Sequence, residues 1–243
     1  MLNQPTESHA GETPGLAEQS LSEARRLRRL PLLSSKVIHI DDPHRDERRR
    51  VEAFVEETYA RVYGGRVHRH YPTLMSVQDR SGRIYAVVGF RLASEGALFL
   101  EQYLSEPVES AIASSFGEDG PARATITEIG NLASDGRGST LFLFGALASH
   151  LRNLGGQYAV ATATQELRGI FTKVGIDTVE LGRADASRLP DGGRTWGSYY
   201  STDPVVLAGS IGQSLGPLTK SRVPAPQERP LCSRLHYMDR GHS

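Results

Sequence analysis

The spacing of apolar side chains predicts a helix followed by a hairpin in the first part of the chain. Residues 46–63 carry apolar side chains at the three- and four-residue steps of an amphipathic helix, at Val51, Phe54, Val55, Tyr59 and Val62. Gly64 and Gly65 end this helix. Residues 73–78 and 84–92 predict two strands joined by a turn. Gly89 within the second strand indicates a bulge or a close backbone approach.

The central stretch, residues 125–155, predicts a buried strand, a glycine turn and an amphipathic helix in succession. Ile126, Ile129 and Leu132 lie among polar side chains, as is typical of a mostly buried strand. The turn that follows, residues 134–139, is small and polar and contains two glycines. Apolar side chains then return at helical spacing, at Leu141, Phe144, Ala148, Leu151 and Leu154.

The rest of the chain continues this alternation of strands and helices. An apolar patch and a helix are predicted within 97–115, a strand within 158–164, and a helix at 166–174 that Gly175 closes. A strand is predicted at 176–181, then a polar segment with aromatic side chains, then a final helix at 205–215. The order predicts an α/β (α+β) fold, a mixed sheet with helices on both faces.

Three regions are expected from the distribution of Gly, Pro and charge. Residues 1–45 predict a flexible, partly basic arm in which 19–31 could form a short helix, residues 46–215 a domain, and residues 216–243 a disordered tail. Nine basic side chains against four acidic ones lie within 25–50. This excess could dock an acidic partner, or it could belong to a solvated arm.

Composition narrows the classes of function. Lys and Arg number 28 and Asp and Glu number 28, so no overall charge favours nucleic acid. The single cysteine, Cys232, fits a reducing cytoplasm, and no secretory signal is apparent at the start. No apolar run reaches the roughly 20 residues of a transmembrane helix. His68 and His70 lie two apart without further ligands at suitable spacing, so no metal site is expected.

The strand, the turn and the helix at 125–155 together form a pattern that suits an anion. Free backbone N–H groups and the helix dipole favour phosphate at such a helix N-terminus. The alternative interpretation is a turn that binds nothing and contains glycines only because its backbone needs positive φ angles. The turn is neither a Walker loop nor a dinucleotide fingerprint, because neither glycine pattern is present.

Three family resemblances rest on motifs in this sequence. The run Ala133-Ser134-Asp135-Gly136-Arg137-Gly138 resembles the Q/RxxGxG/A motif of GNAT acyltransferases, with Ala133 at the usual Gln or Arg position. The run from Glu128 to Ala133, EIGNLA, resembles the E-x-S-R-F-A strand of acyl-homoserine-lactone synthases, with Asn131 at their arginine position. Residues of about 50 to 212 resemble the thermostable hemolysins nearly end to end, including YARVYGGRV, YPTLM, LFLEQYL, TEIGNLAS and WGSYY.

These resemblances imply a GNAT-like fold, whose mixed sheet is mostly antiparallel with helices on both faces. They also imply an acyltransferase and assign roles to named residues. Glu128 is expected as the catalytic base, with an ion pair to Arg91 as the alternative role. Asn131 is expected to orient substrate or stabilise an oxyanion, with a hydrogen bond to the backbone alone as the alternative role. Glu101 and Tyr103 form a second polar pair, catalytic or structural. The acyl carrier is expected on the backbone of Ala133, Ser134, Asp135, Gly136, Arg137, Gly138 and Ser139.

The expected pocket lies beside the central strand, where GNAT sheets separate to admit the pantetheine arm. Thr162 and Thr164 are predicted to line it on the neighbouring strand. Trp196, Tyr199 and Tyr200 are predicted to wall an acyl or acceptor pocket, with plain core packing as the alternative.

The function predicted from the sequence is transfer of a fatty acyl group to a small amine in the cytoplasm. Acyl-coenzyme A or acyl carrier protein would be the donor substrate, the basic stretch 25–50 could meet the acidic carrier protein, and no tightly bound cofactor is expected. A membrane-active protein, as the family name suggests, is one alternative, and lysis could also come from a surfactant-like product. A GNAT-derived binding module without chemistry is the other alternative.

Overall fold

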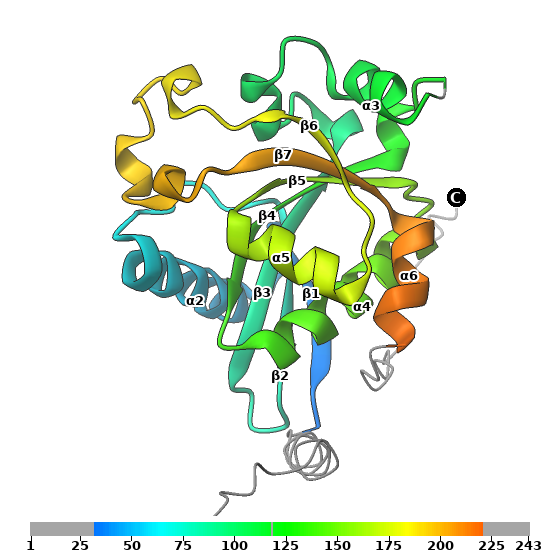
Figure 1. Ribbon diagram of the computed structural model, residues 1–243. Coiled ribbons are helices and arrows are strands. Elements are labelled where there is room, and N and C mark those ends of the chain that lie inside the picture. Colours follow the sequence, from blue (N-terminus) through cyan, green and yellow to red (C-terminus); the bar gives the residue numbers. More distant parts are fainter. Residues whose placement is uncertain (1–31, 118, 221–243) are drawn as a thin grey trace, which may run out of the picture.

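The computed structural model describes residues 32–117 and 119–220 (Figure 1). Seven strands form one sheet in the order β1-β2-β3-β4-β5-β7-β6, in which only β4 and β5 pair in parallel. The mixed, mostly antiparallel sheet expected from the sequence is therefore confirmed. The strands are β1 (Ser34–His39), β2 (Thr73–Gln78), β3 (Ile84–Leu92), β4 (Ile126–Ser134), β5 (Tyr158–Ala163), β6 (Val179–Arg183) and β7 (Val205–Ser210).

Helices cover both faces of this sheet, as the sequence predicts. On one face α4 and α6 pack against each other and α4 covers β2 and β3, with α5 beside them. On the other face α2 packs on β3 and β4, while α3 packs on β6. The helices are α2 (Arg45–Tyr63), α3 (Val108–Phe116), α4 (Arg137–Asn153), α5 (Gln165–Val174) and α6 (Ile211–Lys220).

The last part of the domain differs from its prediction. The helix expected at 205–215 is wrong, because Val205–Ser210 forms β7 and α6 begins only at Ile211. Val205 to Ala208 is a continuous apolar run, so the spacing of its apolar residues does not distinguish a helix from a strand. Its pairing with both β5 and β6 makes it a buried strand. Helix α6 also continues to Lys220, beyond the expected domain end at 215.

The beginning of the domain also differs from its prediction. Ser34–His39, within the arm expected for 1–45, forms β1 and pairs with β2 along its whole length. Arg48, counted in the basic stretch, is 5% exposed and donates to the carbonyl oxygens of Ile38, Tyr71 and Pro72. Arg48 therefore holds the fold together instead of facing a partner. The helix predicted at 19–31 and Cys232 lie outside the described residues.

A β-bulge interrupts the pairing of β3 with β4. Val87 pairs with Ala133 and Gly89 pairs with Gly130, so Asn131 and Leu132 both oppose the single residue Val88. Asn131 takes the left-handed conformation, with φ 48°, that such a bulge permits. The parallel pairing of β4 with β5 ends at Ile129 and Ala161, just before the bulge. The sheet therefore opens between these two strands.

Candidate functional site

A cavity of about 870 Å³ lies where β4 and β5 separate. Gly130, Asn131 and Leu132 line it from β4, and Ala161 and Thr162 line it from β5. Side chains from both faces of the sheet complete its lining, so the cavity extends through the gap. This volume falls within the range of small-molecule binding sites.

One side of the cavity, under α4, α5 and α6, is apolar. No charged side chain lies among the residues that line this part, and Ser214 of α6 is the one hydroxyl from these three helices. The apolar lining residues are Phe144, Leu147, Ala148, Leu151, Leu167, Phe171, Ile176, Ile211 and Leu218. Small residues of β5 and β7, including Ala159, Ala208 and Gly209, leave the space between strands and helices open. The shape and chemistry of this part suit an aliphatic chain.

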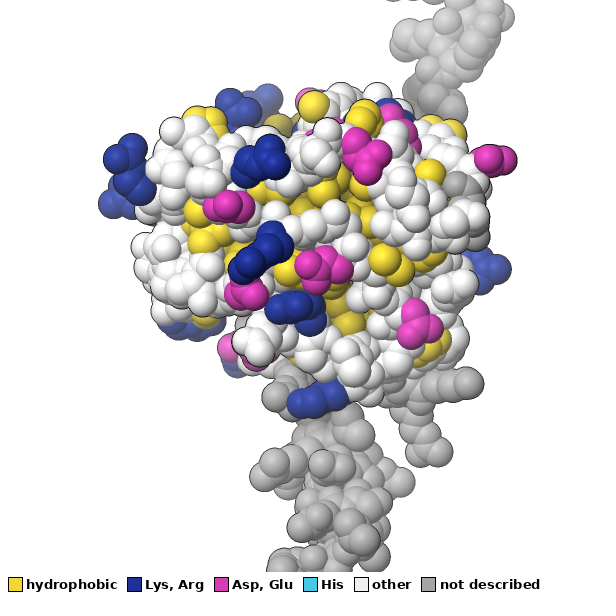
Figure 2. Space-filling view, turned by 45° about the horizontal axis from the view of Figure 1, so that its top comes forward, with side chains coloured by type: hydrophobic (Ala, Val, Ile, Leu, Met, Phe, Trp, Pro, Cys, Tyr) yellow, Lys and Arg dark blue, Asp and Glu magenta, His cyan; other side chains and the backbone are white. Residues whose placement is uncertain are grey.

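The other side of the cavity is walled by aromatic rings. The phenol groups of Tyr103 and Tyr200 hydrogen bond to each other, and the Tyr199 hydroxyl donates to the Thr162 carbonyl oxygen. Apolar side chains gather in the middle of the face seen in Figure 2, with charged side chains of both signs around them. The cavity-lining rings on this side are Tyr59, Tyr71, Phe99, Tyr103, Trp196, Tyr199 and Tyr200.

Tyr71 lies flat against two paired glycines of the sheet. Gly89 and Gly130 are opposite each other, and a Cβ atom on either would come within 2.7 Å or 2.5 Å of Tyr71 side-chain atoms. The close approach that Gly89 indicated in the sequence is thus present. Burial and the nearby Glu128 carboxylate raise the pKa of Tyr71 well above its ordinary value, so its hydroxyl stays protonated.

Asn131 lies at the bulge and lines the cavity. Its side-chain oxygen accepts a hydrogen bond of 3.1 Å from the backbone N–H of Tyr71, and the residue is 6% exposed. Asn131 thereby joins β4 to the segment that precedes β2. Its amide NH₂ group is the part of the side chain that this contact leaves for a ligand.

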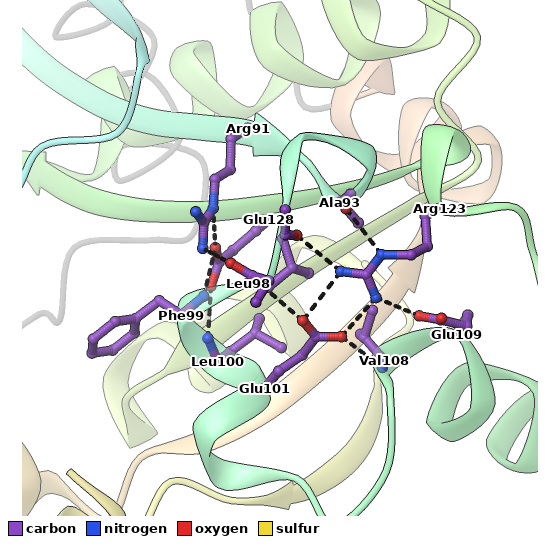
Figure 3. A network of polar contacts seen from close by, with 12 residues as sticks. Arg91, Ala93, Leu98, Phe99, Leu100, Glu101, Val108, Glu109, Arg123 and Glu128 are labelled. Carbon is purple, nitrogen blue, oxygen red and sulfur yellow. Dashed lines mark hydrogen bonds and ion pairs between the residues drawn. The ribbon is translucent and has the colours of Figure 1, made fainter. Parts of the chain in front are cut away.

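Glu128 is held by donors on three sides (Figure 3). Its carboxylate accepts hydrogen bonds from Arg91 Nε at 2.8 Å and from the backbone N–H groups of Phe99 and Leu100 at 3.1 and 2.8 Å. Glu128 is 1% exposed and does not line the cavity, although its neighbours Ile129 and Gly130 do. The ion pair with Arg91 is the alternative role that the sequence left open.

Glu101 belongs to a second polar network beside the first (Figure 3). It accepts from Arg123 at 2.7 Å and from the N–H groups of Leu98 and Val108, while Arg123 also pairs with Glu109. Burial alone would raise the pKa of Glu101, but these donors outweigh it and lower the pKa from 4.5 to about 2. Glu101 lines a separate shallow pocket, and Tyr103 has a different partner, Tyr200.

The glycine turn forms the N-terminus of α4. The Ser134 hydroxyl accepts from the Gly136 N–H at 3.2 Å, and the Ser139 and Thr140 hydroxyls donate to the Gly136 carbonyl oxygen. These contacts fix the turn, while residues 137–139 begin the helix and have no intrahelical partner for their N–H groups. Residues 133–139 do not line the cavity.

Most of the pocket residues predicted from the sequence come together. Tyr103, Thr162, Trp196, Tyr199 and Tyr200 line the cavity, whereas Thr164 caps α5 by accepting from the Leu167 N–H. Sequence reasoning missed many other lining residues, among them Tyr59, His70 and Tyr71. His70 was visible only as half of a His-x-His pair, and in the part of the chain described here no group of three metal-binding side chains forms.

Comparison with known proteins identifies the fold. LasI, an acyl-homoserine lactone synthase, is 14% identical with a TM-score of 0.53, covering 75% of this chain and 91% of LasI. BjaI, a CoA-dependent acyl-homoserine lactone synthase solved with SAM and isopentyl-CoA, is 16% identical with a TM-score of 0.51, covering 78% and 89%. FeeM, an N-acyl amino acid synthase from uncultured soil microbes, is 11% identical with a TM-score of 0.50, covering 75% and 93%.

The fold is therefore GNAT-like, as the sequence motifs predict. No curated protein matches the chain. The model of the thermostable hemolysin family matches residues 41–215, which is more than half of the chain. The chain belongs to the thermostable hemolysin family.

Proposed function

We propose that the protein transfers a fatty acyl group from a thioester donor to the nitrogen of a small amine. The observation that carries this proposal is the cavity in the gap between β4 and β5, which is apolar under α4–α6 and polar at the β4 bulge. In this proposal the acyl chain would occupy the apolar part, and the thioester carbon would lie at the bulge, where the strands separate. The similarity of fold to BjaI and FeeM supports this class of reaction.

The proposed donor is acyl-coenzyme A or acyl carrier protein, in the cytoplasm. Its phosphate groups would bind outside the cavity, at the N-terminus of α4, where backbone N–H groups and the helix dipole favour anions. The pantetheine arm would then enter between the strands. The acceptor would approach from the aromatic side, where Asn131 and Tyr71 lie.

The first experiment is an incubation of the purified protein with acyl-CoA donors of graded chain length and a mixture of amines. We expect N-acyl amides by mass spectrometry and equivalent release of free thiol. Ala161→Phe, which fills the cavity, should abolish transfer while the protein stays folded. Ala60→Phe places the same side chain on an exposed position of α2 that does not line the cavity, and should not change the rate. Equal rates in Ala161→Phe and wild type would contradict the proposal.

A second experiment tests the place of the donor's phosphates. A Cβ atom on Gly136 would meet nothing within 4 Å, and its backbone is extended, so Gly136→Val leaves the fold intact. The added side chain would stand where the backbone must approach a phosphate. We expect acyl-CoA affinity to fall, measured by calorimetry, with an unchanged melting temperature. Unchanged affinity would remove the turn from the donor site.

A further inference from the structure

His70 lies in the segment between α2 and β2 and lines the cavity. Its ring Nε2 is 2.9 Å from Oε1 of Glu56 on α2, and its side chain is 12% exposed. Its other ring nitrogen, Nδ1, is buried and has no hydrogen-bond partner among the described residues. A buried polar atom without a partner is unfavourable, and a ligand that donates a hydrogen bond to it would relieve this cost.

The backbone around His70 is held in place from two sides. Arg48 donates to the carbonyl oxygens of Tyr71 and Pro72, and Asn131 accepts from the Tyr71 N–H. His70 is therefore one residue away from a direct contact with the β4 bulge, where the thioester is proposed to lie. Because these hydrogen bonds fix the backbone beside His70, its side chain is positioned before a ligand binds.

We propose that His70 is the general base of the acyl transfer and that Glu56 is its positioning residue. This inference rests on the proposed function. The Glu56 carboxylate accepts the Nε2–H proton and so leaves the lone pair on Nδ1. As the amine nitrogen bonds to the thioester carbon, its proton moves to Nδ1. The carbon–sulfur bond then breaks, and the proton passes from His70 to the leaving thiolate, which gives an amide and a free thiol.

The other candidate bases are less suitable than His70. The Glu128 carboxylate accepts from Arg91 and from two backbone N–H groups, lies near the Tyr71 hydroxyl, and does not line the cavity. The Glu101 carboxylate forms an ion pair with Arg123 and lines a separate pocket. His68 lines the cavity, but it is exposed and has no carboxylate partner in the parts of the chain that the structure describes.

The kinetic test compares single-turnover acyl transfer from acyl-CoA in matched variants. His70→Gln should lower the rate by about 10²–10⁴-fold, as removal of a general base does, while acyl-CoA affinity stays unchanged. His70→Ala should regain part of its rate when imidazole is added to the buffer. His44→Gln is the control, because the His44 ring also pairs with a carboxylate, Asp42 at 2.8 Å, but lies outside the cavity.

A spectroscopic test does not depend on activity. Nitrogen-15 NMR of the histidine rings should show the Nε2–H tautomer for neutral His70, and Glu56→Gln should disturb it and slow transfer. An Nδ1–H tautomer, a wild-type rate in His70→Gln, or no rescue by imidazole would each overturn the role of His70 and leave the acyl transfer standing. A wild-type protein that transfers no acyl group from any thioester overturns the proposed function, and the role of His70 with it.

Discussion

At the scale of single residues, Glu128 shows how a strand position can be predicted while its role cannot. Its place on a buried strand follows from the pattern around Ile126 and Ile129. Its partners do not, because the N–H groups of Phe99 and Leu100 lie 29 and 28 residues away along the chain. The short helix that carries these donors, Phe99–Tyr103, appears in the sequence only as an apolar patch.

These contacts predict the effect of Glu128→Gln. The amide keeps one acceptor oxygen but presents an NH₂ group to donors that a carboxylate satisfied. We expect the free energy of unfolding to fall by about 1–3 kcal/mol, measured by urea titration. The single-turnover rate of the folded fraction should stay near that of the wild type. A stable variant that has lost its rate would restore Glu128 as the base.

Contacts between residues that are distant in the sequence also explain why some cavity residues were missed. His70 and Glu56 are 14 residues apart and belong to a loop and a helix, so no periodicity joins them. Asn131 was recognised by its place in a motif, but its left-handed conformation depends on the unequal pairing of β3 and β4. The aromatic wall was easier to predict, because Trp196, Tyr199 and Tyr200 are close in sequence.

At the scale of elements, local pattern predicts what lies within one helix or hairpin. Helix α2, the β2–β3 hairpin and α5 appear close to where the sequence places them, since their periods and their glycine caps are local. Strands β1 and β7 were missed, because each forms by pairing with strands that are distant in the sequence. The gap between β4 and β5 was expected from the GNAT resemblance alone.

The position of the Tyr71 ring depends on the two glycines beneath it, Gly89 and Gly130. Gly130→Ala would bring a Cβ atom to 2.5 Å from the Tyr71 ring, so the ring must move into the cavity. We expect a loss of about 1–3 kcal/mol in the free energy of unfolding. In a Tyr71→Ala background the same substitution should cost much less, which a double-mutant cycle measures. Equal costs in both backgrounds would show that Tyr71 does not rest on Gly130.

The network that ties Phe99–Tyr103 to α3 predicts a dependence of stability on pH. Because the pKa of Glu101 falls from 4.5 to about 2 on folding, its ionised form stabilises the protein above pH 4.5. This contribution is lost as the pH falls from about 4.5 towards 2. Glu101→Gln should therefore be less stable than wild type at neutral pH and should lose less stability across that window. Urea unfolding at several pH values measures this, with exposed Glu106→Gln as the control.

At the scale of the whole molecule, apolar surface is directed inwards. Four core clusters and the cavity contain most of the large apolar side chains, and both faces of the sheet are covered. Within 32–117 and 119–220, few large hydrophobic side chains are exposed: Leu32 and Ile40 beside β1, Val62 in α2 and Leu154 after α4. In the same residues no helix has the length and apolar character to cross a bilayer.

The inward-facing apolar side chains favour an indirect explanation of the lysis to which the family's name refers. A fatty acyl amide is a surfactant, so an enzyme that makes one can lyse cells without touching their membranes. We predict that the purified protein alone releases no dye from lipid vesicles. An organic extract of its reaction with acyl-CoA and amines should release dye in proportion to the amide formed. An extract from Ala161→Phe, treated in the same way, should be inactive. Dose-dependent release by clean protein, with Ala161→Phe as effective as wild type, would show instead that the protein itself acts on membranes.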